Sequence, residues 1–468
     1  MKLRFCGATR EVTGSCFLVE VNDRRILIEC GLIQGAAEDE ARNREPFPFD
    51  PVKIDAVILT HAHLDHSGRL PLLIKAGYRG PIYTHSASCD LARIMLKDAA
   101  YLNQKEAEWE NRKRQRKHLT LVEPLYTLQE AQAVMRRFKT VNYGERIEVL
   151  KGVMLRLVDA GHILGSAIVE LWLAEDGVQR KLVFSGDLGH KGAPILRDPA
   201  VVEEADLVIM ESTYGNRAHR PWDATWAEMD EIFRRAEQVR GNILIPAFAV
   251  GRTQELLYAF KRNFERWGLA RWAVFLDSPM AIEATEVYRH HYEVYDREAS
   301  SERRQEGDLF DLPNLHLTRT AQQSMRINRI EAGAIIIAGS GMCEGGRIKH
   351  HFKHNIWRDQ CQVLIVGYQA RGTMGRALVD GVKNISLWGE TVRVAADIRT
   401  IGGFSAHADC HGLAGWYGCF KARPPVALVH GEPEAMDAFA AAITSMGAQQ
   451  VFTPRFGDVL DLVALKAQ

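Results

Sequence analysis

Four residues of types that bind metal ions lie within six consecutive positions of the segment "THAHLDHSG", which directly follows the apolar run Val57-Ile58-Leu59. These residues are His61, His63, Asp65 and His66. Imidazole nitrogens and carboxylate oxygens suit zinc, and a zinc site with an open coordination position lowers the pKa of bound water to about 7. The pattern therefore predicts a hydrolytic metal centre rather than a purely structural cluster.

Two later segments supply further ligand-type residues. "VDAGHILGSA" contains His162 and "LVFSGDLGH" contains Asp187, and each follows an apolar run typical of a strand. Taken singly, either residue could be an ordinary polar residue at a strand end. Glycines beside both would let the main chain come close to a metal ion. A second ion needs such additional ligands, and a bridging carboxylate would hold two ions about 3.5–4 Å apart.

The elements that position the first cluster are predicted to be a strand, a loop and a helix. Side chains at positions i and i+2 of a strand share one face, so His61 and His63 can converge on one point where the strand opens into a loop. Asp65 and His66 then begin the next helix and can face a second point nearby.

Short apolar runs followed by helix-like segments recur along the chain, which is typical of an α/β fold with largely buried sheets. The runs are Ile54–Thr60, Lys181–Ser185, Leu207–Met210, Asn242–Pro246, Trp272–Leu276, Gly333–Ala338, Gln362–Val366 and Pro425–Val429. The earlier segment "CFLVEVNDRRILIEC" predicts a hairpin around Asn22-Asp23. We therefore expect a mixed sheet first and a more parallel sheet later.

Two other segments are predicted to lie on the surface. Residues 87–117 are expected to form a long helix ending in "NRKRQRK", and this basic run is typical of a solvated helix end more than of a nucleic-acid site. Residues 297–311, "REASSERRQEGDLFD", are expected to form a long polar loop.

Composition limits the classes of protein that the chain can be. A chain of 468 residues predicts two domains. Lys+Arg and Asp+Glu both number 59, so any binding to a polyanion must come from a local patch. Eight cysteines without a CxxC pair predict neither a disulfide framework nor a cysteine zinc site. No apolar run approaches the ~20 residues of a membrane span, and the start lacks a signal peptide's apolar core, so we expect a cytoplasmic protein that does not enter a membrane.

The order of "THAHLDHSG", "AGHILGSA" and "FSGDLG" resembles the metallo-β-lactamase fold, an αββα sandwich that binds two zinc ions at the ends of its sheets. The similarity continues in "MESTYG" with Glu211, "GGFSAHAD" with His407 and "ALVHGE" with His430, which look like motifs A, B and C of the β-CASP branch of RNA- and DNA-processing nucleases. The segments "PAFAVGRTQELL", "LDSPMA", "AGSGMCEGGRIKHHFKHNIW" and "VGYQARGTMGR" resemble the bacterial and archaeal members of that branch.

The resemblance implies a domain order and a ligand set. A β-CASP domain, 214–394, would be inserted into a metallo-β-lactamase domain made of 1–213 and 395–468. Two zinc ions are implied. The ligands of one would be His61, His63 and His162, those of the other would be Asp65, His66 and His430, and Asp187 would bridge both.

One residue departs from the family pattern. The family usually has aspartate where "ILIECG" has Glu29, a position thought to support the metal loop from behind. Groups behind the ligands orient them and tune metal affinity. Glutamate is one methylene longer, so either the loop has adjusted to it or the site is altered.

The resemblance also implies a reaction. A hydroxide activated by two metals would attack the phosphorus of RNA and leave 5′-phosphate and 3′-hydroxyl ends. His407, held by Glu211, is the candidate general acid for the leaving oxygen, with Asp65 as the third catalytic residue. The alternative role of His407 is that of a hydrogen-bonded histidine at the start of a helix.

Contacts to the substrate phosphate are expected from two residues outside these motifs. They are Arg252, near the start of an expected helix, and Ser340, in the glycine-rich "GSGMCEGGR". Holding the two domains together is the alternative role of both. The group His350, His351 and His354 has helical spacing, which favours a surface or cleft face over another metal site.

Three functions are compatible with these residues. The first is a zinc-dependent ribonuclease acting on single-stranded RNA, with His430 in motif C as in the RNA-processing branch. The second is a small-molecule hydrolase of a thioester or lactam, which would not need an inserted domain of this size. The third is a non-catalytic scaffold that binds RNA, favoured only by Glu29. A homodimer, and the choice between endonuclease and exonuclease action, are left open by the sequence.

Overall fold

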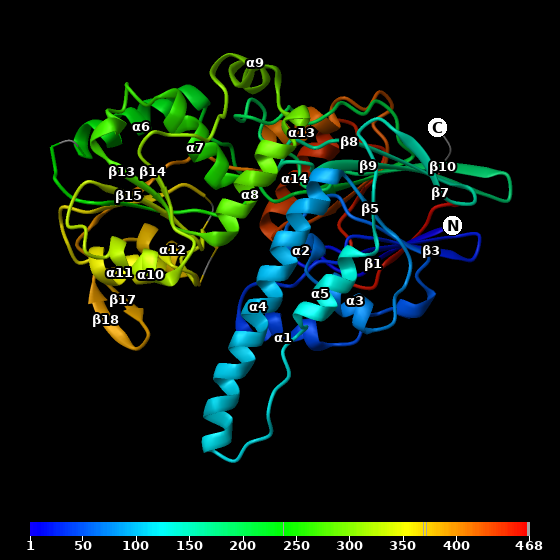
Figure 1. Ribbon diagram of the computed structural model, residues 1–468. Coiled ribbons are helices and arrows are strands. Elements are labelled where there is room, and N and C mark those ends of the chain that lie inside the picture. Colours follow the sequence, from blue (N-terminus) through cyan, green and yellow to red (C-terminus); the bar gives the residue numbers. More distant parts are fainter. Residues whose placement is uncertain (237, 368, 371, 466–468) are drawn as a thin grey trace. The chain divides into compact units, whose positions relative to one another are not determined.

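The computed structural model describes every residue except 237, 368, 371 and 466–468. Tyr368 and Arg371 of the "VGYQARGTMGR" segment thus lie outside the described residues. The chain divides into two compact units: unit 1 comprises Met1–Lys191, Asp198–Ala218 and His407–Gln468, and unit 2 comprises Gly192–Arg197 and His219–Ala406 (Figure 1). The expected α/β class is confirmed, since each unit combines sheets with covering helices.

The first sheet of unit 1 has seven strands in the order β22-β1-β2-β3-β4-β5-β6. Its strands are β1 (Lys2–Phe5), β2 (Phe17–Val21), β3 (Arg24–Ile28), β4 (Ala56–Ile58), β5 (Ile82–Thr84), β6 (Phe138–Thr140) and β22 (Val459–Asp461). Strands β22 to β3 pair antiparallel and β3 to β6 pair parallel, so the sheet is mixed as predicted. The predicted hairpin is confirmed: Asn22 and Asp23 join β2 to β3 with φ of 48° and 57°.

The second sheet of unit 1 also has seven strands, in the order β21-β20-β11-β10-β9-β8-β7. They are β7 (Arg146–Leu150), β8 (Val153–Asp159), β9 (Ala167–Glu175), β10 (Val178–Phe184), β11 (Leu207–Glu211), β20 (Val426–Val429) and β21 (Val451–Phe452). Every second side chain along a strand, such as Leu155 and Leu157 of β8, faces the first sheet. These side chains form one apolar core with Leu3, Val19 and Ile26.

Helices cover the outer faces of both sheets and complete an αββα sandwich. The helices of unit 1 are α1 (Ala37–Ala41), α2 (Leu64–Ser67), α3 (Leu70–Lys75), α4 (Ser86–Arg116), α5 (Leu128–Met135), α13 (Cys410–Tyr417) and α14 (Pro433–Ser445), with short 3₁₀ turns at Arg42–Arg44 and Pro51–Lys53. Helices α3, α4 and α5 pack through Leu73, Leu96 and Val134 on the first sheet, and α13 and α14 pack on the second.

Unit 2 contains a six-stranded parallel sheet in the order β14-β13-β15-β12-β16-β19, as expected for the later part of the chain. Its strands are β12 (Ile243–Pro246), β13 (Ala273–Leu276), β14 (Leu315–Leu317), β15 (Ala334–Ala338), β16 (Gln362–Ile365) and β19 (Asp397–Thr400), and a hairpin is formed by β17 (Asn384–Leu387) and β18 (Glu390–Arg393). Its helices are α6 (Trp222–Ala236), α7 (Arg252–Arg262), α8 (Pro279–His290), α9 (Arg297–Glu306), α10 (Ala321–Ile327), α11 (Ile348–Asn355) and α12 (Met374–Val379), with 3₁₀ turns at Leu269–Arg271 and Tyr292–Val294.

The prediction of a polar loop over residues 297–311 was wrong, because α9 occupies most of it. The Asp296 side chain accepts the Ala299 N–H at 2.7 Å and begins the helix, and Gly307, with φ of 83°, ends it. The long helix predicted over residues 87–117 is confirmed as α4. None of the described helices is long and apolar enough to cross a lipid bilayer.

Candidate metal centre

The ligand-type residues of unit 1 lie on loops that follow four strands. The loop after β4 carries His61 and His63, and the first turn of α2 carries the next two candidates. Strand β4 ends at Ile58, earlier than the expected Thr60, so the loop itself brings the two histidines together. His162 follows β8, Asp187 follows β10 and His430 follows β20.

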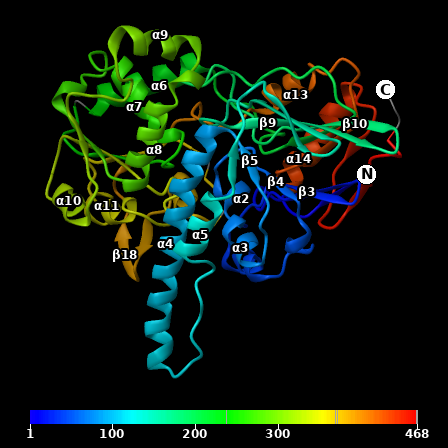
Figure 2. The same ribbon diagram turned by 45° about the vertical axis from the view of Figure 1, so that its right-hand side comes forward.

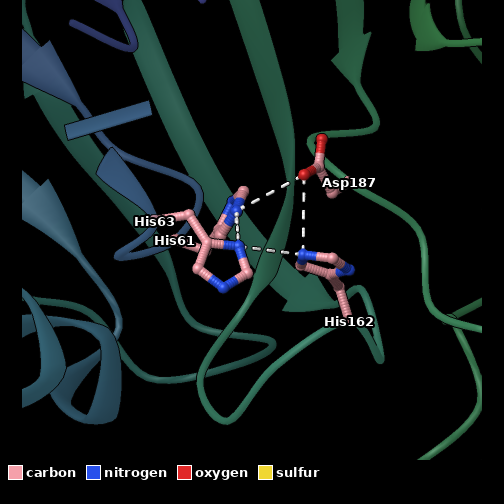
Figure 3. Close-up of side chains that lie close together, drawn as sticks. All are labelled: His61, His63, His162 and Asp187. Atoms are coloured by element: carbon pink, nitrogen blue, oxygen red, sulfur yellow. Dashed lines mark hydrogen bonds and ion pairs between the residues drawn. The ribbon is translucent and has the colours of Figure 1, made fainter. Parts of the chain in front are cut away.

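One group of donor atoms surrounds a single point (Figure 3). His63 Nδ1 lies 3.1 Å from both His61 Nε2 and His162 Nε2. Asp187 Oδ2 lies 3.5 Å from each of the same two Nε2 atoms. Because zinc–nitrogen bonds of about 2.0–2.1 Å place two ligands of a tetrahedral ion about 3.3 Å apart, this group has the spacing of a zinc site.

A second group lies beside the first. His430 Nε2 is 3.4 Å from Asp65 Oδ2, and His66 Nε2 is 3.9 Å from the same oxygen. Asp187 Oδ1 lies 3.3 Å from His66 Nε2 and 3.6 Å from His430 Nδ1. Asp187 therefore turns one oxygen toward each group, which is the arrangement of a bridging carboxylate.

Two buried atoms at this point have no hydrogen-bond partner in the described part of the chain. They are His66 Nε2 and Asp187 Oδ1. Buried polar atoms are costly unless paired, so an unpaired imidazole nitrogen facing an unpaired carboxylate oxygen fits a metal ion between them. Burial, reinforced by neighbouring histidines, lowers the pKa of His63 to about 4 against the opposing pull of Asp65, which keeps its imidazole in the neutral form that binds metal.

Glu29 supports this group from behind with both carboxylate oxygens. Oε1 accepts the Thr60 N–H at 2.7 Å, and Oε2 lies 2.9 Å from His66 Nδ1. A proton on Nδ1 leaves the lone pair of His66 Nε2 free for a metal. The backbone of Glu29 has φ of 64° and its side chain is buried, so the longer acid is accommodated within the core. Burial raises the pKa of Glu29, while its bonds to His66 and Thr60 oppose that rise.

Two threonines that the sequence analysis did not single out perform the same task for other histidines. Thr60 Oγ1 lies 3.0 Å from His61 Nδ1, and Thr213 Oγ1 lies 3.0 Å from His430 Nδ1. Each contact fixes the ring orientation of a candidate ligand. Adjacency to His61 and membership of the "MESTYG" motif were the signals that could have identified them.

His407 lies beside the metal group and is bound by Glu211. Its Nδ1 is 3.1 Å from Glu211 Oε2 and 4.0 Å from Asp187 Oδ2. Glu211 Oε1 also accepts the Leu188 N–H at 2.6 Å, so this carboxylate is already engaged although it lies near Asp187 and His430. Burial opposes protonation of His407, but the Glu211 and Asp187 carboxylates prevail and raise its pKa to about 9.

The main chain around His407 is held by the loop that follows β10, which contains Leu188 and Gly189. Ala408 N–H donates to Leu188 O at 2.7 Å, and His407 forms an isolated antiparallel bridge with Gly189. A Cβ atom on Gly189 would lie 1.9 Å from the carbonyl oxygen of Gly161, so only glycine permits this close packing beside His162.

The two predicted phosphate contacts lie in unit 2. Arg252, at the start of α7, is buried, forms an ion pair with Glu255, and lies 5.3 Å from the centre of the Phe404 ring. Ser340 follows β15, and its Oγ accepts the Gly345 N–H at 3.1 Å within the glycine-rich loop. Their assignment to substrate stays a prediction.

The three histidines of α11 do not form a metal group in the described part of unit 2. His351 is buried and pairs with Asp277 at 2.7 Å and with Asn328 at 3.1 Å. The His350 ring packs 4.5 Å from the ring of Trp388. The segment therefore contributes a structural hydrogen-bond network.

Three family descriptions match successive parts of the chain. They are "Metallo-beta-lactamase superfamily" over residues 9–247, "Beta-Casp domain" over 253–378 and "Zn-dependent metallo-hydrolase RNA specificity domain" over 391–454.

Relatives match over nearly the whole chain. Ribonuclease TTHA0252 of Thermus thermophilus is 38% identical over 452 residues, covering 97% of this chain and 98% of its own. Transcription termination factor FttA of Methanocaldococcus jannaschii is 32% identical, covering 97% of this chain and 70% of its own length. FttA of Pyrococcus abyssi is 32% identical, covering 92% of this chain and 66% of its own length. A crystal structure of an Enterococcus faecalis protein of unknown function has the same fold, with a TM-score of 0.54 at 14% identity over 98% of this chain and 99% of that one.

Proposed function

Because the chain belongs to the β-CASP group of the metallo-β-lactamase superfamily, we propose that it is a zinc-dependent ribonuclease that hydrolyses phosphodiester bonds of single-stranded RNA. The observation that carries the proposal is the Asp187 carboxylate, which turns one oxygen toward each of two groups of histidines beside the His407–Glu211 pair. Ribonuclease TTHA0252, by its name, shares this class of activity.

The residues of the two groups would hold two zinc ions. The ligands proposed for one ion are His61, His63 and His162, those for the other are Asp65, His66 and His430, and Asp187 would serve both. When bound, two zinc ions stabilise the charge of a phosphodiester and supply a nucleophile at neutral pH.

This chain's own residues do the proton chemistry at the leaving group. Glu211 occupies Nδ1 of His407, so the proton delivered to the departing 3′ oxygen is the one on Nε2. The Glu211 carboxylate favours the protonated imidazole, which can then donate this proton as the phosphorus–oxygen bond breaks. Cleavage then leaves 5′-phosphate and 3′-hydroxyl ends.

The domain arrangement is part of the proposal. The β-CASP insertion, 214–394, divides the metallo-β-lactamase domain into 1–213 and 395–468. The Beta-Casp match over residues 253–378 lies inside this range, and the main segment of unit 2, His219–Ala406, begins five residues and ends twelve residues later than it; both support an insertion in this part of the chain.

Zinc analysis combined with incubation on end-labelled RNA tests the function. We expect close to two zinc ions per chain. The new 5′ end of each RNA fragment should carry a phosphate that a phosphatase removes. Asp187→Ala should lose most of both zinc ions and the hydrolysis, whereas Asp359→Ala, an exposed acid, should keep both.

DNA of the same sequence and small thioester or lactam substrates serve as comparisons. RNA should be cut faster than DNA, and the small substrates should be inert. Faster cleavage of DNA, or turnover of a lactam without any of RNA, would overturn the proposal. RNA binding without zinc or cleavage would indicate a scaffold instead.

A further inference from the structure

The long helix α4 and the segment that returns from it form an arm, residues 101–125, that extends beyond the rest of unit 1 (Figure 2). The last buried side chain of α4 is Ala107, nine residues before the helix ends at Arg116. The returning segment is bound to the helix rather than loose: Asn111 exchanges two hydrogen bonds with the main chain of Val122, at 2.9 and 2.8 Å, and Arg114 donates to Thr120 O at 2.9 Å.

The base of the same helix contacts a loop of the metal centre. Ser88 Oγ donates to Gly165 O at 2.7 Å, and Gly165 is three residues after His162. The helix is 31 residues long, so it reaches about 46 Å from this loop to its end.

One face of the arm carries exposed aromatic side chains next to cations. Trp109 is 60% exposed and Tyr101 is 51% exposed. The Lys113 ammonium lies 3.1 Å from the centre of the Trp109 ring, and that of Lys105 lies 5.8 Å from the Tyr101 ring. Positions 101, 105, 109, 112 and 116 recur at spacings of three or four, so they share one face of the helix.

The end of the arm is strongly positive. The seven residues 112–118, "RKRQRKH", contain five Lys or Arg and no acid. Arg112, Arg116 and Lys117 are exposed, and within the described part of the chain they form no ion pair with an acid, unlike Arg114, which pairs with Glu110. A chain with zero formal net charge has therefore concentrated cations at one end of one element.

This combination fits single-stranded nucleic acid better than a protein partner. Aromatic residues and arginine are common in protein–protein interfaces too, but the core of such an interface is depleted of charge. A run of cations without an acid, beside exposed aromatic rings, allows contact with the phosphate backbone together with stacking on bases. The structure adds to the sequence the exposed Trp109 next to this run, which a merely solvated helix end does not need.

Resting on the proposed ribonuclease function, we infer that the arm is a second RNA-binding surface, which holds single-stranded RNA away from the metal centre and feeds it toward the loop of His162. Trp109 stacks on a base while Arg112, Arg116 and Lys117 contact phosphates. The arm raises affinity for long RNA and takes no part in bond breaking.

Binding of labelled phosphorothioate RNA, which keeps the backbone charge and resists hydrolysis, tests this with the zinc-loaded protein. The arm variant Arg112→Gln/Arg116→Gln/Lys117→Gln should bind an RNA of about 40 nucleotides roughly tenfold more weakly and one of about six nucleotides as well as wild type. The slope of its plot of log affinity against log salt concentration should be smaller in magnitude by about 2, because each of the three lost phosphate contacts accounts for about 0.7. Trp109→Ala should weaken long RNA about tenfold with the salt slope unchanged.

The matched control Lys53→Gln/Lys151→Gln/Arg455→Gln removes three exposed cations elsewhere on unit 1 and should bind both RNAs as wild type does. Cleavage of the short RNA should be unchanged in the arm variants. Equal losses in the arm and control variants, or wild-type binding of long RNA by the arm variant, would refute the inference. If the arm variant had a lower sedimentation coefficient than wild type, the arm would be identified instead as a contact between copies of the chain. Failure of wild type to cut the short RNA would count against the proposed function and leave the binding comparison to decide the arm.

Discussion

Glu29 stands where the family resemblance implies aspartate, and its two oxygens serve both the Thr60 N–H and His66 Nδ1. Glu29→Gln keeps the length but places an amide N–H₂ against a donor, so one of the two bonds is lost. We expect zinc affinity about 10- to 100-fold lower, because groups behind metal ligands have effects of this size. Competition against a zinc chelator measures it.

Two companion variants separate charge from length at this position. Glu29→Asp should keep hydrolysis within about tenfold, or ~1.4 kcal/mol in the barrier. Glu20→Gln removes a carboxylate that pairs with Arg25 on the neighbouring strand and should leave zinc affinity unchanged. An intact affinity in Glu29→Gln would mean that His66 is oriented by other groups.

The second prediction at the residue scale concerns His407 as the proton donor. His407→Ala should keep both zinc ions and cut RNA about 10² to 10⁴-fold more slowly, the usual contribution of general acid catalysis. A substrate with sulfur in place of the 3′-bridging oxygen has a better leaving group and hardly needs the proton, so the defect should shrink greatly. Equal defects on the two substrates would instead give His407 a role in positioning the phosphate.

At the scale of the elements, the end of β13 is joined to α10 and α11 through Asp277. This fully buried carboxylate accepts hydrogen bonds from Thr318, from Ser324 at 2.6 Å and from Arg347 at 2.7 Å, and it pairs with His351. Burial alone would raise its pKa, but these partners lower it from 3.8 to about 2.

This network predicts a pH dependence with a definite sign. A carboxyl whose pKa is lower in the folded state stabilises that state above its unfolded pKa of 3.8, here by about 2 kcal/mol, and the contribution is lost as the pH falls through about 2. In urea unfolding, the difference in free energy between wild type and Asp277→Asn should therefore shrink from pH 5 to pH 2. Asp359→Asn, at an exposed site, should show a difference near zero throughout. A constant gap for Asp277→Asn would mean that the carboxyl keeps its proton in the folded protein.

Which elements could be predicted depended on whether their residues face a core. The apolar runs that became β12, β15 and β16 are buried on both faces, so hydrophobicity alone located them. Helix α9 buries only Ala299, so no apolar period marked it, and the decisive signals were the capping residues Asp296 and Gly307.

The candidate site divides in the same way. Histidines and carboxylates in "THAHLDHSG" are conspicuous, because metal binding explains so many at that spacing better than a structural role does. The supporting contacts of Thr60 and Thr213 depend on loops that meet only in the folded chain, and single-residue chemistry does not reveal them. The exposure of Trp109 likewise could not be predicted, because it depends on α4 continuing past its last buried residue, Ala107.

At the scale of the whole molecule, all seven proposed zinc ligands belong to unit 1, although His430 lies far along the chain from the other six. Zinc should therefore raise the free energy of unfolding of unit 1 by about 4 kcal/mol when the free zinc concentration is a thousand times Kd. The stability of unit 2 should not change. Calorimetry with and without a chelator should move one unfolding transition and leave the other in place. Calcium added after chelation should not restore the shift, since nitrogen ligands do not suit it. Two transitions that moved together would mean that the units unfold as one.

The chain re-enters unit 1 at His407, the proposed proton donor itself, and that residue's main chain is paired with Gly189. A protein engineer who replaced unit 2 with a short linker would thus be rebuilding the active site at the splice. A linker that joins Ala218 to His407 preserves the chemistry only if it delivers the main chain to Gly189 in extended form; a splice even two residues later would discard the acid together with the domain.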